Sequence, residues 1–131
     1  IAHCIGTWQQ LAAAPSIEPR LIPSEIGLLC ARGLIRVGSE LGGMVVVGGI
    51  APDVWPPDDA QLSALARTFG ADGASVRANA HEVYRLDRAG QAKVLRAVQR
   101  VADIFSHIAA IRRESDSAHS QAQSLSQEQS T

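Results

Sequence analysis

The chain has 131 residues, the length of one domain, and 46% of them are hydrophobic, enough to build a packed core. The formal net charge of −1 is balanced, which argues against direct contact with nucleic acid. No apolar run approaches the ~18 residues that span a bilayer, and no signal segment opens the chain. Because the sequence begins at Ile1 inside an apolar-periodic pattern, we expect it to be a fragment of a longer protein.

The first expected helix spans residues 3–14, where apolar residues follow helical spacing until Pro15 stops it. The proline-rich residues 16–25 favour a connector, with a short strand near residues 20–22. The apolar run 26–30 fits either a strand or a tight turn.

Two β-prone runs, residues 34–37 and 44–50, flank a glycine-rich turn and predict a hairpin over residues 33–50. The second run holds three consecutive valines, and its apolar continuity favours a central strand buried on both faces. Gly48 and Gly49 interrupt that strand and indicate a bulge or the close approach of backbone or ligand.

A proline-rich loop follows the hairpin and leads into two short helices. Asp58 or Asp59 caps the first of these helices, and Gly70 ends it. Residues 72–80 are expected to form the second, and residues 82–86 a short extended or turning piece.

The longest expected helix runs over residues 87–113 and carries two apolar stripes at heptad spacing. The stripes are Val94, Val98, Val101, Phe105 and Ile108, and Ala97, Val101, Ile104, Ile108 and Ile111. One part of this face is expected to cover the sheet and another to meet a second copy, giving a homodimer. The Ser/Gln-rich residues 114–131 should form a disordered tail or linker after a single domain over residues 1–113. The predicted fold class is therefore α+β, a small antiparallel sheet covered by helices with a long C-terminal helix.

The two cysteines, Cys4 and Cys30, form no CxxC pair, so we expect a reduced, cytoplasmic protein. With His3 they offer thiolate and imidazole ligands for a metal, but a closed zinc site needs a fourth ligand. The alternative is that both are small buried apolar residues. No phosphate loop, GxGxxG fingerprint or GxSxG elbow is present, so neither an enzyme nor a cofactor is expected.

Three larger side chains have two interpretations each. Arg36 either orients a polar ligand group, or lies on a solvated face or in an internal ion pair. Trp55 either floors an apolar pocket or packs over the edge of the core, and Trp8 either lines the same pocket or belongs to the core.

Several short motifs resemble the second half of a PocR-type sensory domain. They are HCIGTWQQLA around Cys4, CARGL over Cys30–Leu34, the hairpin, the Phe69–Gly70 pair, and the closing helix VLRAVQRVADIFSHIA. The resemblance implies a PAS/GAF-like fold and a non-enzymatic sensor in bacterial transcriptional or signalling regulators. It implies small hydrocarbon-derived ligands such as short diols, and N-terminal strands that are missing or supplied by a partner.

The ligand site predicted from these observations comprises Cys4, Trp8, Cys30, Leu34, Arg36 and Trp55. Binding is expected to shift the C-terminal helix and so to signal to an output domain or dimer partner. A metal- or redox-responsive sensor using His3, Cys4 and Cys30, and a structural dimerisation module without ligand, are the alternatives.

Overall fold

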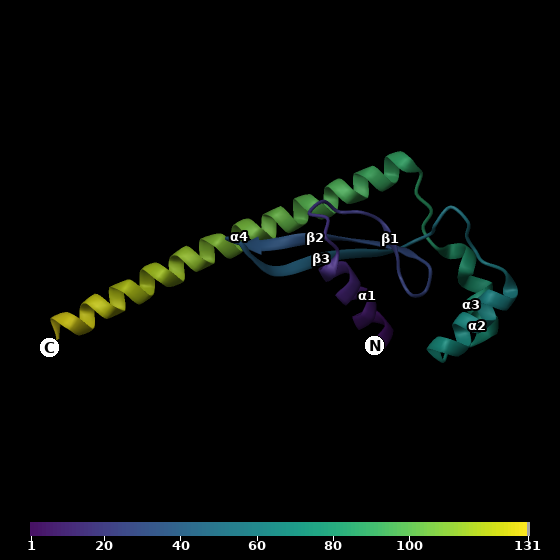
Figure 1. The fold of residues 1–131 in the computed structure, drawn as a ribbon, viewed down its shortest axis with the longest axis horizontal. Helices are drawn as coiled ribbons and strands as arrows, with labels where there is room; N and C mark the ends of the chain where they lie inside the picture. The colour runs from purple at the N-terminus through teal and green to yellow at the C-terminus, as the bar shows by residue number, and fades with distance from the viewer. Residues whose placement is uncertain (131) are drawn as a thin grey trace.

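The computed structural model describes residues 1–130, which form a three-stranded antiparallel sheet between helices (Figure 1). In chain order the elements are α1 (Ala2–Ala13), β1 (Ile22–Pro23), β2 (Leu29–Val37), β3 (Glu40–Ile50), α2 (Asp59–Phe69), α3 (Gly73–Asn79), the 3-10 turn η1 (Ala80–Glu82) and α4 (Arg88–Gln129). The α+β fold class is confirmed, as are the first helix, the hairpin and the two short helices.

Local signals account for most helix ends. Asp58 caps α2 in a capping box with Gln61, and Gly70 ends that helix in the left-handed conformation. The side chain of Asp87 accepts a hydrogen bond from the Gly90 amide at 2.7 Å and starts α4. Asp72 caps α3 in the same way through Ser75.

The predicted position of the valine-rich strand was wrong. The strand order is β1-β2-β3, so β2 is central and β3, which carries the valines, lies at one edge. Val46 is 40% exposed, although a central strand would bury it. The expected turn over residues 38–43 is also shorter, because β3 already begins at Glu40. Pairing between strands is a non-local choice, and the composition of one strand does not decide it.

The C-terminal helix is longer than expected. Its predicted end near Arg113 was wrong, because α4 continues to Gln129 and extends well beyond the sheet (Figure 1). No glycine or proline follows Gly90, and Ala, Gln and Glu are good helix formers, so nothing stops the helix. Residues 114–130 are exposed throughout, so this part of the helix adds nothing to the core.

Alternation along β2 assigns one face of the sheet to each flanking helix. Ala31 and Gly33 face α4, where Val98 and Ala102 are buried. The intervening Arg32 bonds instead to the end of α1, which lies on the opposite face (Figure 1).

Gly33 allows α4 to lie directly on β2. A Cβ added at this position would come within 2.8 Å of both the Ala102 Cβ and the Val98 carbonyl oxygen. The Gly33→Ala variant is therefore expected to lose about 1–3 kcal/mol of unfolding free energy through overpacking, measured by urea denaturation.

Gly43→Ala is the matched control for this substitution. It lies on β3, where an added Cβ would meet the Ile35 Cδ1 at 3.8 Å, an ordinary contact. Equal stability changes in the two variants would contradict close packing at Gly33.

Candidate functional site

A cavity of about 180 Å³ lies between the N-terminal half of α1 and the sheet face opposite α4. The turn before β2 and the end of α2 complete its wall. The lining residues are His3, Cys4, Thr7, Trp8, Ser24, Glu25, Ile26, Leu28, Cys30, Val46, Gly48, Gly49 and Phe69. Three of the residues predicted for the ligand site, Cys4, Trp8 and Cys30, thus meet in one cavity.

Helical spacing brings the α1 side chains to this wall. His3 and Thr7, and likewise Cys4 and Trp8, are four residues apart and so lie on one face of the helix. Thr7 is buried, whereas Trp8 is 49% exposed. Trp8 therefore contributes ring surface to the cavity while keeping contact with solvent.

The opposite wall comes from paired strands. Cys30 on β2 and Val46 on β3 contribute side chains to this wall. Gly48 and Gly49 also line it but have no side chains, so only their backbone borders the cavity. The β2–β3 register shifts by one residue near these glycines, and Gly49 has a φ of +77°, which glycine adopts readily. The predicted bulge at Gly48–Gly49 is confirmed, and it adjoins the cavity.

A polar pair lies at the mouth of the cavity. His3 Nδ1 and Glu25 Oε2 are 2.6 Å apart, and both side chains are partly exposed. The His3 ring also packs edge-on against Phe69, with ring centroids 4.7 Å apart. These contacts join the start of α1 to the turn before β2 and to the end of α2, and they place hydrogen-bonding groups beside an apolar space.

The two thiols differ in environment, and neither is in a disulfide. Cys4 is exposed, whereas Cys30 is buried and its Sγ lies 3.5 Å from the Ile22 carbonyl oxygen. Burial raises the pKa of the Cys30 thiol from its ordinary value of 9.0, because a thiolate is poorly solvated there. Within residues 1–130, no three His, Cys, Asp or Glu side chains are grouped closely enough to hold a metal ion.

The other three predicted site residues lie outside this cavity. Leu34 and Arg36 are further along β2, and Arg36 is exposed. The Trp55 Nε1 donates to the Ala80 carbonyl oxygen at 2.7 Å, and the ring lines a neighbouring hollow of about 290 Å³. Glu25 and Ile26 line both hollows, so the turn that carries them separates Trp55 from the cysteines.

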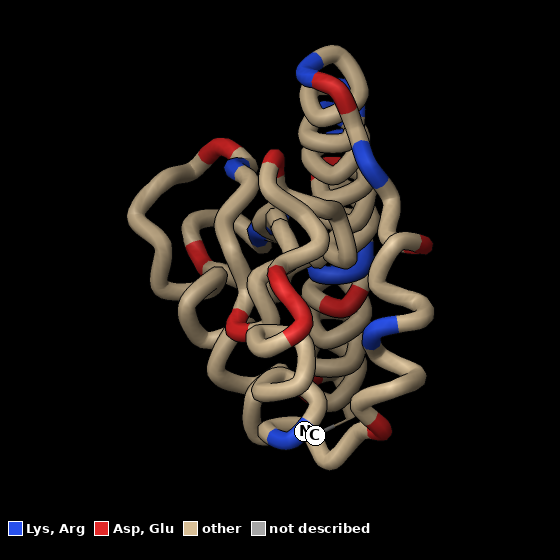
Figure 2. Tube along the Cα trace, turned by 90° about the vertical axis from the view of Figure 1, so that its right-hand side faces the viewer, with Lys and Arg blue, Asp and Glu red and all other residues tan. Residues whose placement is uncertain are grey.

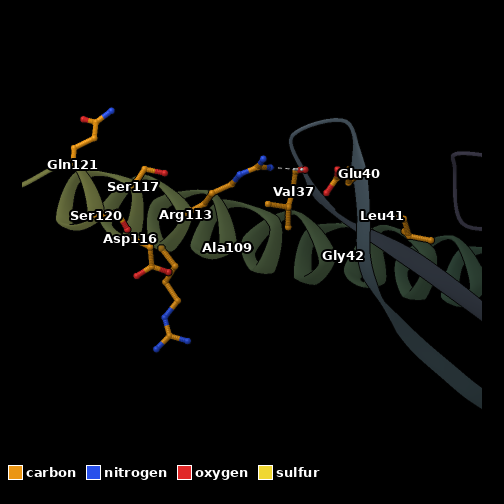
Figure 3. A pocket seen from close by; sticks show the side chains of 11 residues that line it. Val37, Glu40, Leu41, Gly42, Ala109, Arg113, Asp116, Ser117, Ser120 and Gln121 are labelled. Atoms are coloured by element: carbon orange, nitrogen blue, oxygen red, sulfur yellow. Dashed lines mark hydrogen bonds between the residues drawn. The ribbon is translucent and has the colours of Figure 1, made fainter. Parts of the chain in front are cut away.

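A larger hollow of about 850 Å³ lies where the tip of the hairpin meets α4 (Figure 3). Arg113 extends from α4 toward the Val37 carbonyl oxygen there, with a nitrogen–oxygen distance of 3.5 Å (Figure 3). Most of its lining side chains are exposed, including Glu40, Leu41 and Asp116. It is an open groove, unlike the enclosed sites that surround small ligands.

Basic and acidic residues are interspersed along the chain (Figure 2). Over residues 1–130, none of the helices combines the length and the apolar character that crossing a membrane requires.

Comparison with known families gives one match that spans most of the chain. Residues 1–110 match the model described as the sensory domain found in PocR. The chain belongs to the PocR sensory-domain family. A sensory role for the PocR domain agrees with a small cavity of mixed polarity, and it suggests a function without catalysis. No curated protein and no solved structure matches the chain.

Sequence reasoning missed several lining residues of the PocR domain. Val46 and Phe69 reach the cavity through strand pairing and the position of α2, for which the sequence carries no local signal. Thr7 did have a local signal in the sequence, because it lies four residues after His3 on the face of α1 that also holds Cys4.

The thiol environments predict an order of alkylation. At about pH 8, iodoacetamide should modify Cys4 well before Cys30, because Cys30 is buried and its raised pKa makes the reactive thiolate scarcer. The rate at Cys30 should rise as the pH increases through its folded-state pKa. Mass spectrometry of the two peptides gives both rates, and protein unfolded in urea provides the control. Faster labelling of Cys30 in the folded protein would contradict this arrangement.

Proposed function

We propose that this PocR domain is the sensor of a bacterial, cytoplasmic regulator and binds a small hydrocarbon-derived molecule, such as a short diol, in the cavity beside Cys4 and Cys30. The observation that carries the proposal is the convergence of Cys4, Trp8 and Cys30 on one cavity of about 180 Å³. That volume suits a molecule of a few non-hydrogen atoms.

The chemistry of the lining supports this ligand class. Val46, Leu28 and Ile26 offer apolar surface, and the glycines leave room for an alkyl chain. The His3–Glu25 pair at the mouth supplies a donor and acceptors for a hydroxyl group. Small-molecule sites commonly combine an apolar lining with a few placed polar groups in this way.

The central strand offers a route from the cavity to α4. Cys30 lines the cavity, while the neighbouring Ala31 and Gly33 face α4 on the other side of the sheet. Near the far end of β2, the Arg36 amide donates to the Ser106 Oγ at 3.0 Å. A ligand that favours one position of β2 would thereby favour one position of α4, as a population shift between two arrangements.

We also propose that the domain acts as a homodimer through α4. The stripe Ala97, Val101, Ile104, Ile108 and Ile111 is exposed along its length, and Ile104 remains 59% exposed. The same alternation of steps of four and three continues through Ser115, Ala118, Ala122 and Leu125 along the exposed end of the helix. A second copy of this helix carries the same apolar stripe, so the two helices can pair along it residue for residue. A shift of α4 would then reach an output domain through the paired helices.

Filling the cavity tests the ligand proposal. In a titration with 1,2-propanediol followed by amide NMR, resonances near Cys30 and Gly48 should shift and saturate. Cys4→Trp should weaken binding at least tenfold, which corresponds to ~1.4 kcal/mol, because the indole occupies the cavity. Gln9→Trp adds the same ring on the exposed side of α1 and should leave binding unchanged. Equal affinities in both variants would exclude this cavity as the site.

A charge placed in this apolar stripe of α4 tests the homodimer proposal. Ile108→Asp should convert a dimer into monomers in sedimentation equilibrium, since each protomer loses ~1.5 kcal/mol or more of apolar burial. His107→Asp places the same charge on an adjacent exposed position outside the stripe and should preserve the dimer. A wild-type protein that stays monomeric at high concentration would refute pairing through α4.

A further inference from the structure

A second, separate cavity of about 210 Å³ lies at the C-terminal end of α1. It shares no lining residue with the cavity beside the cysteines. Leu11, Pro15 and Ile22 give it an apolar wall, and two cationic side chains, Arg20 and Arg32, also line it.

Arg32 is a buried cation without an anionic partner. The residue is only 3% exposed, and within residues 1–130 no carboxylate forms an ion pair with it. Its Nε donates to the Leu11 carbonyl oxygen at 2.6 Å, and its Nη2 donates to those of Ala14 and Ser16, both at 2.8 Å. The remaining nitrogen, Nη1, is buried and has no hydrogen-bond partner in the described part of the chain.

An anion bound in this cavity would offset the unpaired positive charge of Arg32. The carbonyl groups at the end of α1 stabilise the Arg32 charge only in part, because they carry partial charges. A buried charge costs free energy unless it is paired, and a buried donor without an acceptor adds to that cost. Arg20 brings a second positive charge to the same cavity, and none of the described residues forms an ion pair with it either.

We propose that this cavity binds a small aliphatic carboxylate. Arg20 is exposed and makes the bidentate contact to the carboxylate, while the uncompensated charge of Arg32 lies behind it. The three hydrogen bonds from Arg32 to the carbonyl groups at the end of α1 stay in place. The alkyl part of the ligand packs against Leu11, Pro15 and Ile22, which excludes strongly hydrated anions such as phosphate as the preferred ligand.

The two cavities of the domain share α1. Cys4 and Trp8, in its N-terminal half, line the first cavity, and Leu11 and Ala14, at its C-terminal end, line the second. The carboxylate would therefore hold α1 against β2, a role beyond the sensing of a neutral ligand.

The test uses sodium butyrate, with 1-butanol as the neutral probe of similar shape and sodium chloride at matched ionic strength. In amide NMR, butyrate should shift resonances between Ala14 and Ile22 in a saturable way, and it should raise the melting temperature. Arg20→Gln should weaken butyrate binding at least tenfold, and because Arg20 is exposed this variant should fold normally. Arg67→Gln removes an exposed charge on α2 and should change nothing.

Three outcomes would overturn the proposal. The first is unchanged butyrate affinity in Arg20→Gln, and the second is an equal response to 1-butanol, chloride or phosphate. The third is loss of butyrate binding in Cys4→Trp, which would place the anion in the other cavity. Retained butyrate binding in Cys4→Trp, together with loss of 1,2-propanediol binding, separates this site from the proposed sensing site.

Discussion

The attachment of α1 to the sheet depends on the guanidinium of Arg32. Its three hydrogen bonds reach the carbonyl groups of Leu11, Ala14 and Ser16, which lie at or just beyond the end of the helix. A cation at this end also interacts favourably with the helix dipole. Both cavities have α1 as a wall, so one buried side chain on β2 positions the helix that forms them.

The central strand serves both faces of the molecule because its side chains alternate. Cys30 and Arg32 face α1, while Ala31 and Gly33 face α4. The second pair must be small, since α4 approaches β2 closely enough to exclude even a Cβ at Gly33. Tight packing of this kind transmits a displacement rather than absorbing it. The central strand is therefore in close contact with the long helix at Gly33.

The long helix has two different apolar faces. The face with Val98 and Ala102 is buried on the sheet, whereas Ile104 and Ile111 remain about half exposed on another side. A helix that only covered a sheet would need one stripe. The second stripe follows heptad spacing past the end of the sheet.

The sequence by itself determined the elements whose causes are local. The caps at Asp58 and Asp87, the stop at Gly70 and the hairpin all follow from residue types at their own positions. Cys4, Trp8 and Cys30 were predicted to share a ligand site, and all three line one cavity.

Only the tertiary structure decided the rest, because it depends on which distant segments pair. It made the valine-rich β3 an edge strand and turned Trp55 toward Ala80 instead of the cysteines. It also gave Arg32, which the sequence marks only as a charge within an apolar run, a buried place at the end of α1.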